Sequence, residues 1–253
     1  MIKKLWRVTE WLFPNICVLC AAASDNDIAL CKACQAELPW LANACERCAL
    51  PLPHDDIGLC NHCFKEPPPY DRAMALFAYQ APIDRLITSI KFQNKLVNAS
   101  VLGALLARSA AHHYAQSLSQ PDCIIPIPLH TKRCRKRGFN QALELARPLA
   151  SALNIPLEYR VAHRTRATAA QSDIHAVERR SNMKNAFELN KDFTAKHVIV
   201  VDDVMTTGST VNAFCDILNV HNVSRIDVWC CARTGIKTRD KSDPQQHHLH
   251  VCE

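Results

Sequence analysis

Apolar and polar positions change their spacing along the chain, and the changes predict alternating elements. Runs of apolar residues with little polar alternation are typical of strands buried on both faces, and we predict four, at 72–79, 122–128, 197–201 and 225–233. Helix-like segments lie between or beside them, at 81–92, 98–118, 140–153 and 210–222. Strands that alternate with helices predict right-handed crossovers and a parallel α/β sheet with helices on both faces.

The first quarter of the chain lacks this alternation and is instead marked by cysteines. Its last cysteine pair ends at Cys63, and the proline-rich "KEPPPYD" at 65–71 follows, which favours an extended connection. We therefore expect two units, an N-terminal helix with a cysteine-rich module at 1–66 and the α/β domain at 67–253.

Eight of the 14 cysteines form four C-x-x-C pairs: Cys17/Cys20, Cys31/Cys34, Cys45/Cys48 and Cys60/Cys63. Each pair can place two sulfurs on one ion, and tetrahedral Zn²⁺ takes four, so the pattern predicts two closed, structural Cys₄ sites in a double zinc ribbon. Sequential pairing joins the first pair with the second and the third with the fourth. A cross-brace would join the first with the third; sequential pairing closes shorter loops and is favoured.

The ends of the chain give little sign of export. Arg7, Thr9 and Glu10 interrupt the apolar run of "MIKKLWRVTEWLFPNIC", which makes it a poor signal peptide. No window reaches the roughly 18 apolar residues of a transmembrane segment. Metal-bound thiolates then predict a cytoplasmic protein. The amphipathic face of residues 2–13 is expected to dock on the protein, with a membrane surface or partner as the alternative, and the histidine-rich 247–252 to be a tail.

The distribution of charge along the chain is more informative than the net charge. The formal net charge is +6, and two zinc tetrathiolates of about −2 each bring it to about +2. The chain as a whole is therefore not strongly basic. The local exception is a basic loop at 130–141, "HTKRCRKRGFNQ", after the strand at 122–128.

The stretch "VIVVDDVMTTGST" at 198–210 carries the clearest chemistry. Ligands of open α/β sheets sit beyond the carboxyl ends of the strands, where Asp202 and Asp203 stand. The N–H groups and hydroxyls of the turn that follows suit a phosphate monoester, and the missing lysine excludes a nucleotide P-loop. Two acids beside a phosphate cradle favour neutral hydroxyls, as on a ribose.

This stretch resembles the 5-phosphoribosyl-1-pyrophosphate (PRPP) signature of type I phosphoribosyltransferases: an apolar strand, two acids, two residues, then T-T-G-x-T. The resemblance implies that fold, and Mg²⁺ bound together with PRPP. It implies that Asp202 and Asp203 bind the ribose hydroxyls. It also implies a set of ligands for the 5′-phosphate: Thr206, Thr207, Gly208, Ser209 and Thr210.

Further segments are similar to the ComF/GntX family of competence- and DNA-utilisation-associated proteins, in which a zinc-ribbon region precedes a phosphoribosyltransferase-like domain. They are "IKFQN" at 90–94, "IPIPLHTKRCRKRGFNQALELA" at 125–146, "RTRATAAQSDIHAVERRSNMKNAF" at 164–187 and the cysteine pairs. The resemblance covers nearly the whole chain.

The resemblance assigns the basic loop to the pyrophosphate side of the site, with Arg137 and Gly138, and Lys91 is a second cation candidate. Candidates for nucleic-acid contact in this loop are Arg133, Arg135, Lys136 and Phe139. The related enzymes have a mobile loop that closes over PRPP, here with Arg164, Thr168 and Gln171. A nucleic-acid role or a solvated connection is the alternative for that segment.

Two functions follow as hypotheses. The first is Mg²⁺-dependent phosphoribosyl transfer linked to DNA uptake or utilisation, in natural competence. The second is a non-catalytic protein that binds single-stranded DNA, senses PRPP and works with DNA-uptake or replication-restart proteins.

Overall fold

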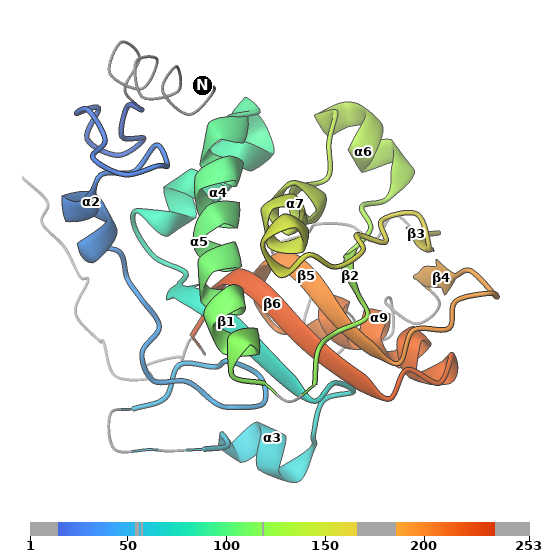
Figure 1. Cartoon of the computed structure of the whole chain (residues 1–253). Helices are drawn as coiled ribbons and strands as arrows, with labels where there is room; N and C mark the ends of the chain where they lie inside the picture. The colour runs from blue at the N-terminus through green and yellow to red at the C-terminus, as the bar shows by residue number, and fades with distance from the viewer. Residues whose placement is uncertain (1–14, 54–55, 57, 118, 166–185, 236–253) are drawn as a thin grey trace, which may run out of the picture.

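Figure 1 shows a computed structural model of the chain, which describes residues 15–53, 56, 58–117, 119–165 and 186–235. Its centre is a sheet of four parallel strands in the order β1-β6-β5-β2. The strands are β1 (Arg72–Ala78), β2 (Cys123–Pro126), β5 (His197–Met205) and β6 (Arg225–Arg233). The prediction of a parallel α/β sheet is confirmed.

Helices cover both faces of this sheet (Figure 1). The helices on one face are α4 (Ile83–Gln93), α5 (Leu96–Ala115) and α7 (Gln141–Leu153), and α9 (Ser209–Val220) lies on the other. Strand β5 supplies both layers, because Ile199 and Val201 pack with the α5 side while Val198 and Val200 pack with the α9 side. A strand buried on both faces has no polar alternation, which explains its continuous apolar run.

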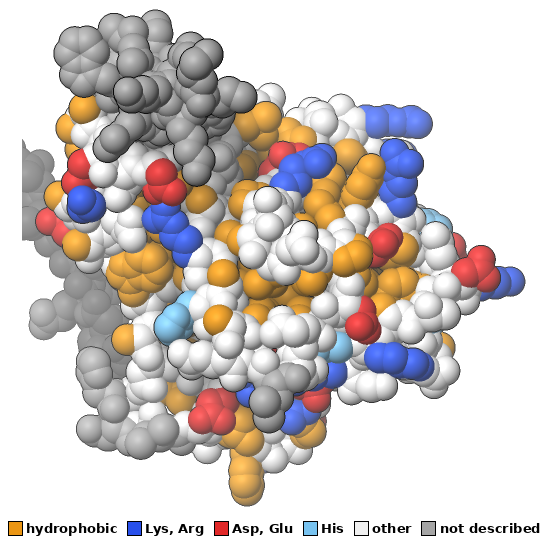
Figure 2. All heavy atoms as spheres, viewed as in Figure 1, with side chains coloured by type: hydrophobic (Ala, Val, Ile, Leu, Met, Phe, Trp, Pro, Cys, Tyr) orange, Lys and Arg blue, Asp and Glu red, His pale blue; other side chains and the backbone are white. Residues whose placement is uncertain are grey.

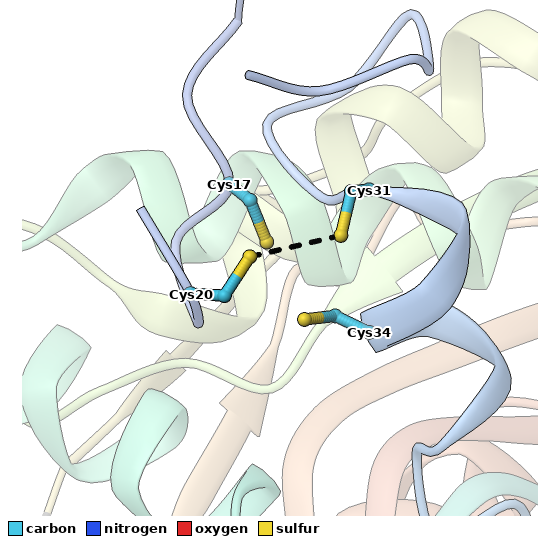
Figure 3. Close-up of side chains that lie close together, drawn as sticks. All are labelled: Cys17, Cys20, Cys31 and Cys34. Carbon is cyan, nitrogen blue, oxygen red and sulfur yellow. Dashed lines mark hydrogen bonds between the residues drawn. The ribbon is translucent and has the colours of Figure 1, made fainter. Parts of the chain in front are cut away.

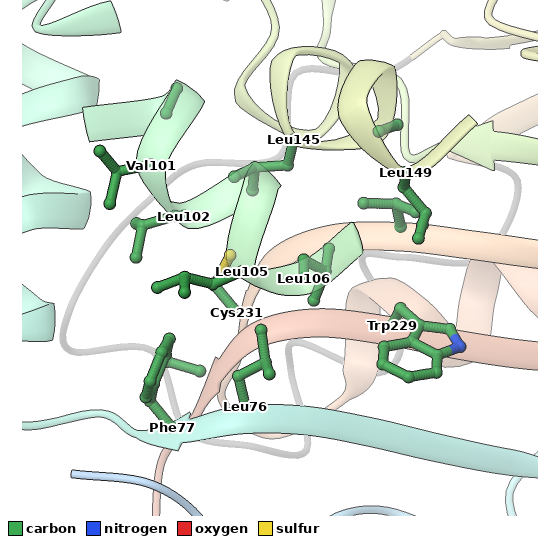
Figure 4. Close-up of a cluster of buried hydrophobic side chains, with 14 of the residues drawn as sticks. Leu76, Phe77, Val101, Leu102, Leu105, Leu106, Leu145, Leu149, Trp229 and Cys231 are labelled. Carbon is green, nitrogen blue, oxygen red and sulfur yellow. The ribbon is translucent and has the colours of Figure 1, made fainter. Parts of the chain in front are cut away.

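The larger core lies between α5, α7 and the sheet (Figure 4). Leu102 and Leu106 of α5 pack with Leu145 and Leu149 of α7 over the strands. Gly103 permits this close approach of the two helices, since a Cβ at that position would lie 3.0 Å from Pro148 Cγ and 3.3 Å from the Leu145 carbonyl oxygen.

Three local features differ from the sequence prediction. Strand β5 continues to Met205 rather than ending at residue 201, because its ladder with β6 runs on to Arg233. The basic segment is a helix, α6 (Thr131–Arg137), and not a loop. An antiparallel hairpin that we did not predict pairs β3 (Ala162–Arg164) with β4 (Phe187–Leu189). Its strands have three residues each, too few for an alternation to be recognised in the sequence.

The cysteine-rich module contributes two short helices, α2 (Lys32–Ala36) and α3 (Asn61–Lys65). Between them, residues 39–41 run along the outer edge of β1. The Leu41 N–H donates to the Leu76 carbonyl and the Ala78 N–H to the Pro39 carbonyl, both at 2.9 Å. Trp40 packs its ring on Phe77 with the ring centroids 4.7 Å apart. The module therefore covers part of the sheet edge.

Within the described ranges, none of the helices combines the length and the apolar character that crossing a bilayer requires. The amphipathic face of residues 2–13 and the histidine-rich 247–252 lie outside the described residues. The division of the chain near residue 66 stays a prediction.

Candidate functional site

The eight paired cysteines gather into two groups of four, in the sequential pairing. Within each group the sulfur atoms all lie within 4.8 Å of one another. The first group comprises Cys17, Cys20, Cys31 and Cys34 (Figure 3), and the second comprises Cys45, Cys48, Cys60 and Cys63. We call them the first and the second ribbon.

The spacing of the sulfurs fits zinc. Four thiolates at about 2.3 Å from a tetrahedral ion lie about 3.8 Å apart. Cys20 Sγ and Cys31 Sγ are 3.8 Å apart, and Cys48 Sγ and Cys60 Sγ are 3.7 Å apart. In the second ribbon the Cys60 N–H also donates to Cys45 Sγ at 3.3 Å, which favours a thiolate there. Both groups are suited to structural Zn²⁺.

The two acids of the central strand lie inside β5, three and two residues before its last position. Asp202 is paired with Cys230 of β6. The Asp203 N–H donates to Asp202 Oδ1 and the Val204 N–H to Asp203 Oδ1, each at 2.9 Å. These bonds fix both carboxylates at the carboxyl end of the sheet.

Lys91, in the last turn of α4, forms an ion pair with Asp203, with Nζ 2.5 Å from Oδ2. Burial opposes the charge of Lys91, but the Asp203 carboxylate outweighs it, so the pKa of Lys91 is raised. Lys91 and Asp203, which are 112 positions apart in the sequence, therefore meet, and a charged amine lies beside the two acids.

Asp202 lies in an environment that favours its protonated form. Burial and the Asp203 carboxylate raise the pKa of Asp202 to about 7, and Lys91 and Arg164 oppose that rise. A carboxyl group that titrates near neutral pH accepts hydrogen bonds from a ligand more strongly as it ionises.

The hydroxyl-rich turn, residues 206–210, connects β5 to α9. Thr207 Oγ1 lies 3.0 Å from Ser209 Oγ, and the Ser209 N–H donates to Thr207 Oγ1 at 3.4 Å. Gly208 has φ +78°, a conformation that residues with a side chain rarely adopt. It lets α9 begin at Ser209, so the first N–H groups of this helix stand beside the hydroxyls. Such a turn suits an anion.

The cations of the basic helix differ in their burial. Arg133 and Arg137 are one turn apart and partly buried, and Asp203 influences Arg137 electrostatically. Arg135 and Lys136 are exposed. Figure 2 shows Lys and Arg side chains projecting where Figure 1 places α6. Gly138 ends this helix, and Phe139 packs against the larger core.

Gln141 is a contributor that the sequence did not single out. Arg137 donates to Gln141 Oε1 at 2.7 Å, and burial together with Arg133 lowers the pKa of Arg137 against the effect of Asp203. Gln141 Nε2 is buried and has no hydrogen-bond partner among the described residues. A buried donor of this kind is costly unless a ligand accepts from it.

Arg164 lies in β3, with its guanidinium 5.2 Å from the centroid of the Phe187 ring in β4. Burial and Arg133 lower its pKa, and Asp202 opposes them, so this arginine belongs to the same electrostatic neighbourhood as the acids. The Thr165 N–H donates to the Ala186 carbonyl at 3.0 Å, which brings together the two ends of the segment between them. Thr168 and Gln171 lie outside the described residues.

Comparisons with known families recognise both parts. The family described as "Double zinc ribbon domain" matches residues 8–71, and the "Phosphoribosyl transferase domain" matches residues 140–248. The chain is thus a phosphoribosyltransferase-domain protein that carries a double zinc ribbon.

Similar proteins identify the family within this class. "DNA utilization protein YhgH" of Escherichia coli O157:H7 is 35% identical over 223 residues, which cover 87% of this chain and 98% of that protein. "Competence protein F" of Haemophilus influenzae is 35% identical over 210 residues, covering 81% and 90%. The chain belongs to the ComF/GntX family, which contains these proteins.

Among solved structures, a purine phosphoribosyltransferase from Pyrococcus horikoshii is similar at 15% identity. The match covers 72% of this chain and 99% of that one, with a TM-score of 0.31. A score of this size carries no argument about the present fold, which rests on the sheet and on the family match.

Proposed function

We propose that this protein binds PRPP with Mg²⁺ at the carboxyl end of β5 and transfers its phosphoribosyl group, in a process linked to DNA uptake or utilisation. One observation carries the proposal. A pair of acids inside a buried strand leads into an anion-binding turn, and Lys91 from a distant helix meets the acids at 2.5 Å. Sugar hydroxyls, a 5′-phosphate and a pyrophosphate each find a partner of suitable chemistry in this arrangement.

In this proposal Asp202 and Asp203 accept hydrogen bonds from the ribose hydroxyls, and residues 206–210 hold the 5′-phosphate. Lys91 and Arg137 hold the pyrophosphate and stabilise its charge as the bond to C1′ breaks. The unpartnered Gln141 Nε2 beside Arg137 offers a further donor for an anion.

Carboxylate oxygens are ligands that Mg²⁺ prefers, so Asp202 and Asp203 fit a magnesium ion held partly through water and by the substrate. Mg²⁺ supplies charge neutralisation for the pyrophosphate when it is bound. In this proposal Arg164 begins the mobile loop expected at 164–180, whose closure would exclude water from the site.

Titration calorimetry with PRPP and Mg²⁺ tests the site directly. We expect binding by the wild type and a loss of roughly a hundredfold in affinity for Asp203→Asn, which removes the carboxylate that pairs with Lys91. No heat for the wild type at millimolar PRPP would refute the proposal. Pyrophosphate release with a panel of bases and amines then separates transfer from sensing.

The raised pKa of Asp202 predicts how PRPP binding depends on pH. The ionised carboxylate accepts from hydroxyls better than the acid, so affinity should rise as the pH passes through about 7. Asp202→Asn should bind more weakly and with a flatter pH profile between pH 6 and 8. An unchanged profile in that variant would remove Asp202 from the ribose site.

Binding of single-stranded DNA is a second candidate, favoured by the exposed side of α6. Arg135 and Lys136 are exposed, and the proposed pyrophosphate site does not use them. The double variant Arg135→Ala/Lys136→Ala should weaken DNA binding and reduce its salt dependence by about two counterions. It should leave PRPP affinity unchanged, whereas Arg137→Ala should weaken PRPP binding. Phe139 packs on the core, which reduces the ring surface it offers to a base.

We assign the protein to the cytoplasm, because two zinc tetrathiolates require a reducing compartment. We propose DNA-uptake or replication-restart proteins as partners, since relatives are named for DNA utilization and for competence. These partners can be tested by passing candidate proteins over the immobilised protein. Candidates that are retained, and that are released when zinc is chelated, would support the proposed partners.

A further inference from the structure

Arg233, the last residue of β6, lies between the second ribbon and the hydroxyl-rich turn. Its side chain is buried, with 6% of its surface exposed. Nε donates to the Cys48 carbonyl at 3.0 Å. Nη1 donates to the carbonyls of Met205 at 3.0 Å, of Thr206 and of Thr234 at 3.1 Å. One guanidinium thus joins a zinc ligand to the first residues of the turn.

A rigid guanidinium can couple the positions of the groups that accept hydrogen bonds from it. Its donors lie in one plane with fixed directions, so carbonyls that accept from it are held in a fixed relation to one another. A buried arginine also depends on these acceptors, because an unpaired buried charge is unfavourable. If the Cys48 carbonyl moves, the guanidinium and the carbonyls of Met205 and Thr206 have to rearrange with it.

Packing joins the two parts at one place, because Ala49, next to Cys48, lies in the same buried cluster as Met205, and the Tyr70 hydroxyl donates to Met205 Sδ at 3.8 Å. A cavity of about 640 Å³ separates the ribbon from the turn, lined by Cys48, Cys63, Thr207, Gly208, Ser209 and Arg233, among others. Beside this cavity, Arg233 is a side chain that hydrogen-bonds to both the ribbon and the turn. A further polar link lies in the same region, since Asn219 of α9 donates to the Pro69 carbonyl at 2.9 Å.

We propose that Arg233 is a positioning residue that couples zinc in the second ribbon to the hydroxyl-rich turn. Zinc holds Cys48 in place, Arg233 holds Met205 and Thr206 relative to Cys48, and the turn keeps the conformation that receives a sugar 5-phosphate. This inference rests on the proposed function of the turn. It makes the second ribbon part of the ligand-binding apparatus, without contact to the ligand.

Coupling between two binding sites is thermodynamically reciprocal, so it can be measured from either site. If zinc in the second ribbon tightens PRPP binding, PRPP must tighten zinc there by the same factor. Couplings of this kind are commonly between about 5- and 150-fold. The first ribbon has no such bridge to the turn among the described residues, so its zinc should be insensitive to PRPP.

The test uses the full chain loaded with two zinc ions. Release of zinc to a chromophoric chelator is followed with and without PRPP and Mg²⁺, and PRPP affinity is measured by calorimetry. For the wild type we expect PRPP to slow the release of one of the two ions by about tenfold. Arg233→Met should keep both ions, bind PRPP about tenfold more weakly and lose the protection. Arg225→Lys, at the other end of β6, is the matched control and should behave as the wild type.

Arg233→Lys covers the case in which the methionine variant does not fold. Lysine keeps the charge but cannot hold the Cys48 and Met205 carbonyls with a planar fork, so it should also weaken PRPP binding and lose zinc protection. Equal affinity and equal protection in a folded Arg233 variant would overturn the inference and leave the proposed function intact.

A wild type that does not bind PRPP would instead defeat the proposed function. In that case the coupling between zinc and the turn can still be tested without a ligand, by measuring amide hydrogen exchange in a peptide that covers residues 205–212. Partial chelation that removes zinc from the second ribbon should speed exchange there in the wild type but not in the Arg233 variant, whose turn is already released. No change in the wild type would overturn the coupling.

Discussion

The two ribbons have nearly the same sequence pattern but different attachments to the rest of the molecule. In the first, Cys17, Leu30 and Leu38 belong to the larger core together with α4 and α5, while Cys20 is exposed to solvent. In the second, all four cysteines are buried in a small cluster of their own with Leu50. The first ribbon is thus attached through the larger core, whereas the second, apart from the packing of Ala49, is joined to the carboxyl end of the sheet by a polar bridge through Arg233.

The contrast shows that two metal sites with the same four ligands can be attached to a protein in different ways. A closed zinc site adds no reactive position, so it acts only through what its loops touch. The loops of the first ribbon touch a hydrophobic core, and those of the second touch the guanidinium that holds the hydroxyl-rich turn.

The largest expected difference comes from removing one ligand of each site. Cys60→Ser and Cys20→Ser should each lower the zinc content from two ions to about one, because a structural site depends on all its ligands. Cys60→Ser should also reduce PRPP affinity by tenfold or more, whereas Cys20→Ser should change it less than about twofold. Metal analysis and calorimetry measure both. Equal PRPP affinities would remove the functional distinction between the ribbons.

The next difference concerns packing. Leu30 is fully buried in the larger core, so Leu30→Ala should lower the free energy of unfolding by about 3 kcal/mol. Leu50 lies in the small cluster, and Leu50→Ala should cost about 1–2 kcal/mol because the surroundings collapse more readily. Urea unfolding of zinc-loaded protein gives both values. A larger loss for Leu50→Ala would show that the second ribbon is the better integrated of the two.

The smallest effect concerns the ion pair between Arg108 of α5 and Asp27 of the first ribbon. Both side chains are substantially exposed, so Arg108→Ala should cost under about 1 kcal/mol. The hydrogen bond from Arg108 lowers the pKa of Asp27, so this contribution is present above the unfolded pKa of about 3.9 and is lost as the pH falls through the lower folded value. Unfolding of wild type and variant at pH 7 and near pH 3, and in high salt, checks this. A difference that persists in acid would point to packing by the arginine stem.

Much of the fold follows from patterns that the chain repeats over many residues. The four strands of the sheet and its four long helices stand where apolar runs and helix-like segments predict them. The eight zinc ligands follow from spacing alone, as does the preference for short closed loops. Such features depend on local sequence, so a single chain is enough to recognise them.

What the sequence did not reveal depends on distant partners. The acids lie inside β5 because β6 continues its ladder beyond Val201, which the residues of β5 do not indicate. The basic segment is a helix in which Arg137 is partly buried and Arg135 is exposed, and the composition of the segment does not indicate this difference. Arg233 resembles an ordinary polar end to an apolar strand, and only its four carbonyl partners reveal that it is buried and bridging.

The strip at residues 39–41 that lies along β1 has a consequence for how the protein is made. An open strand edge invites pairing with other chains, and here part of that edge is covered from within. Because chains are synthesised from the N-terminus, the covering strip leaves the ribosome before the strand that it protects. The strip that covers part of this edge is therefore already synthesised when β1 is made, so β1 does not need a later segment of the chain to cover it.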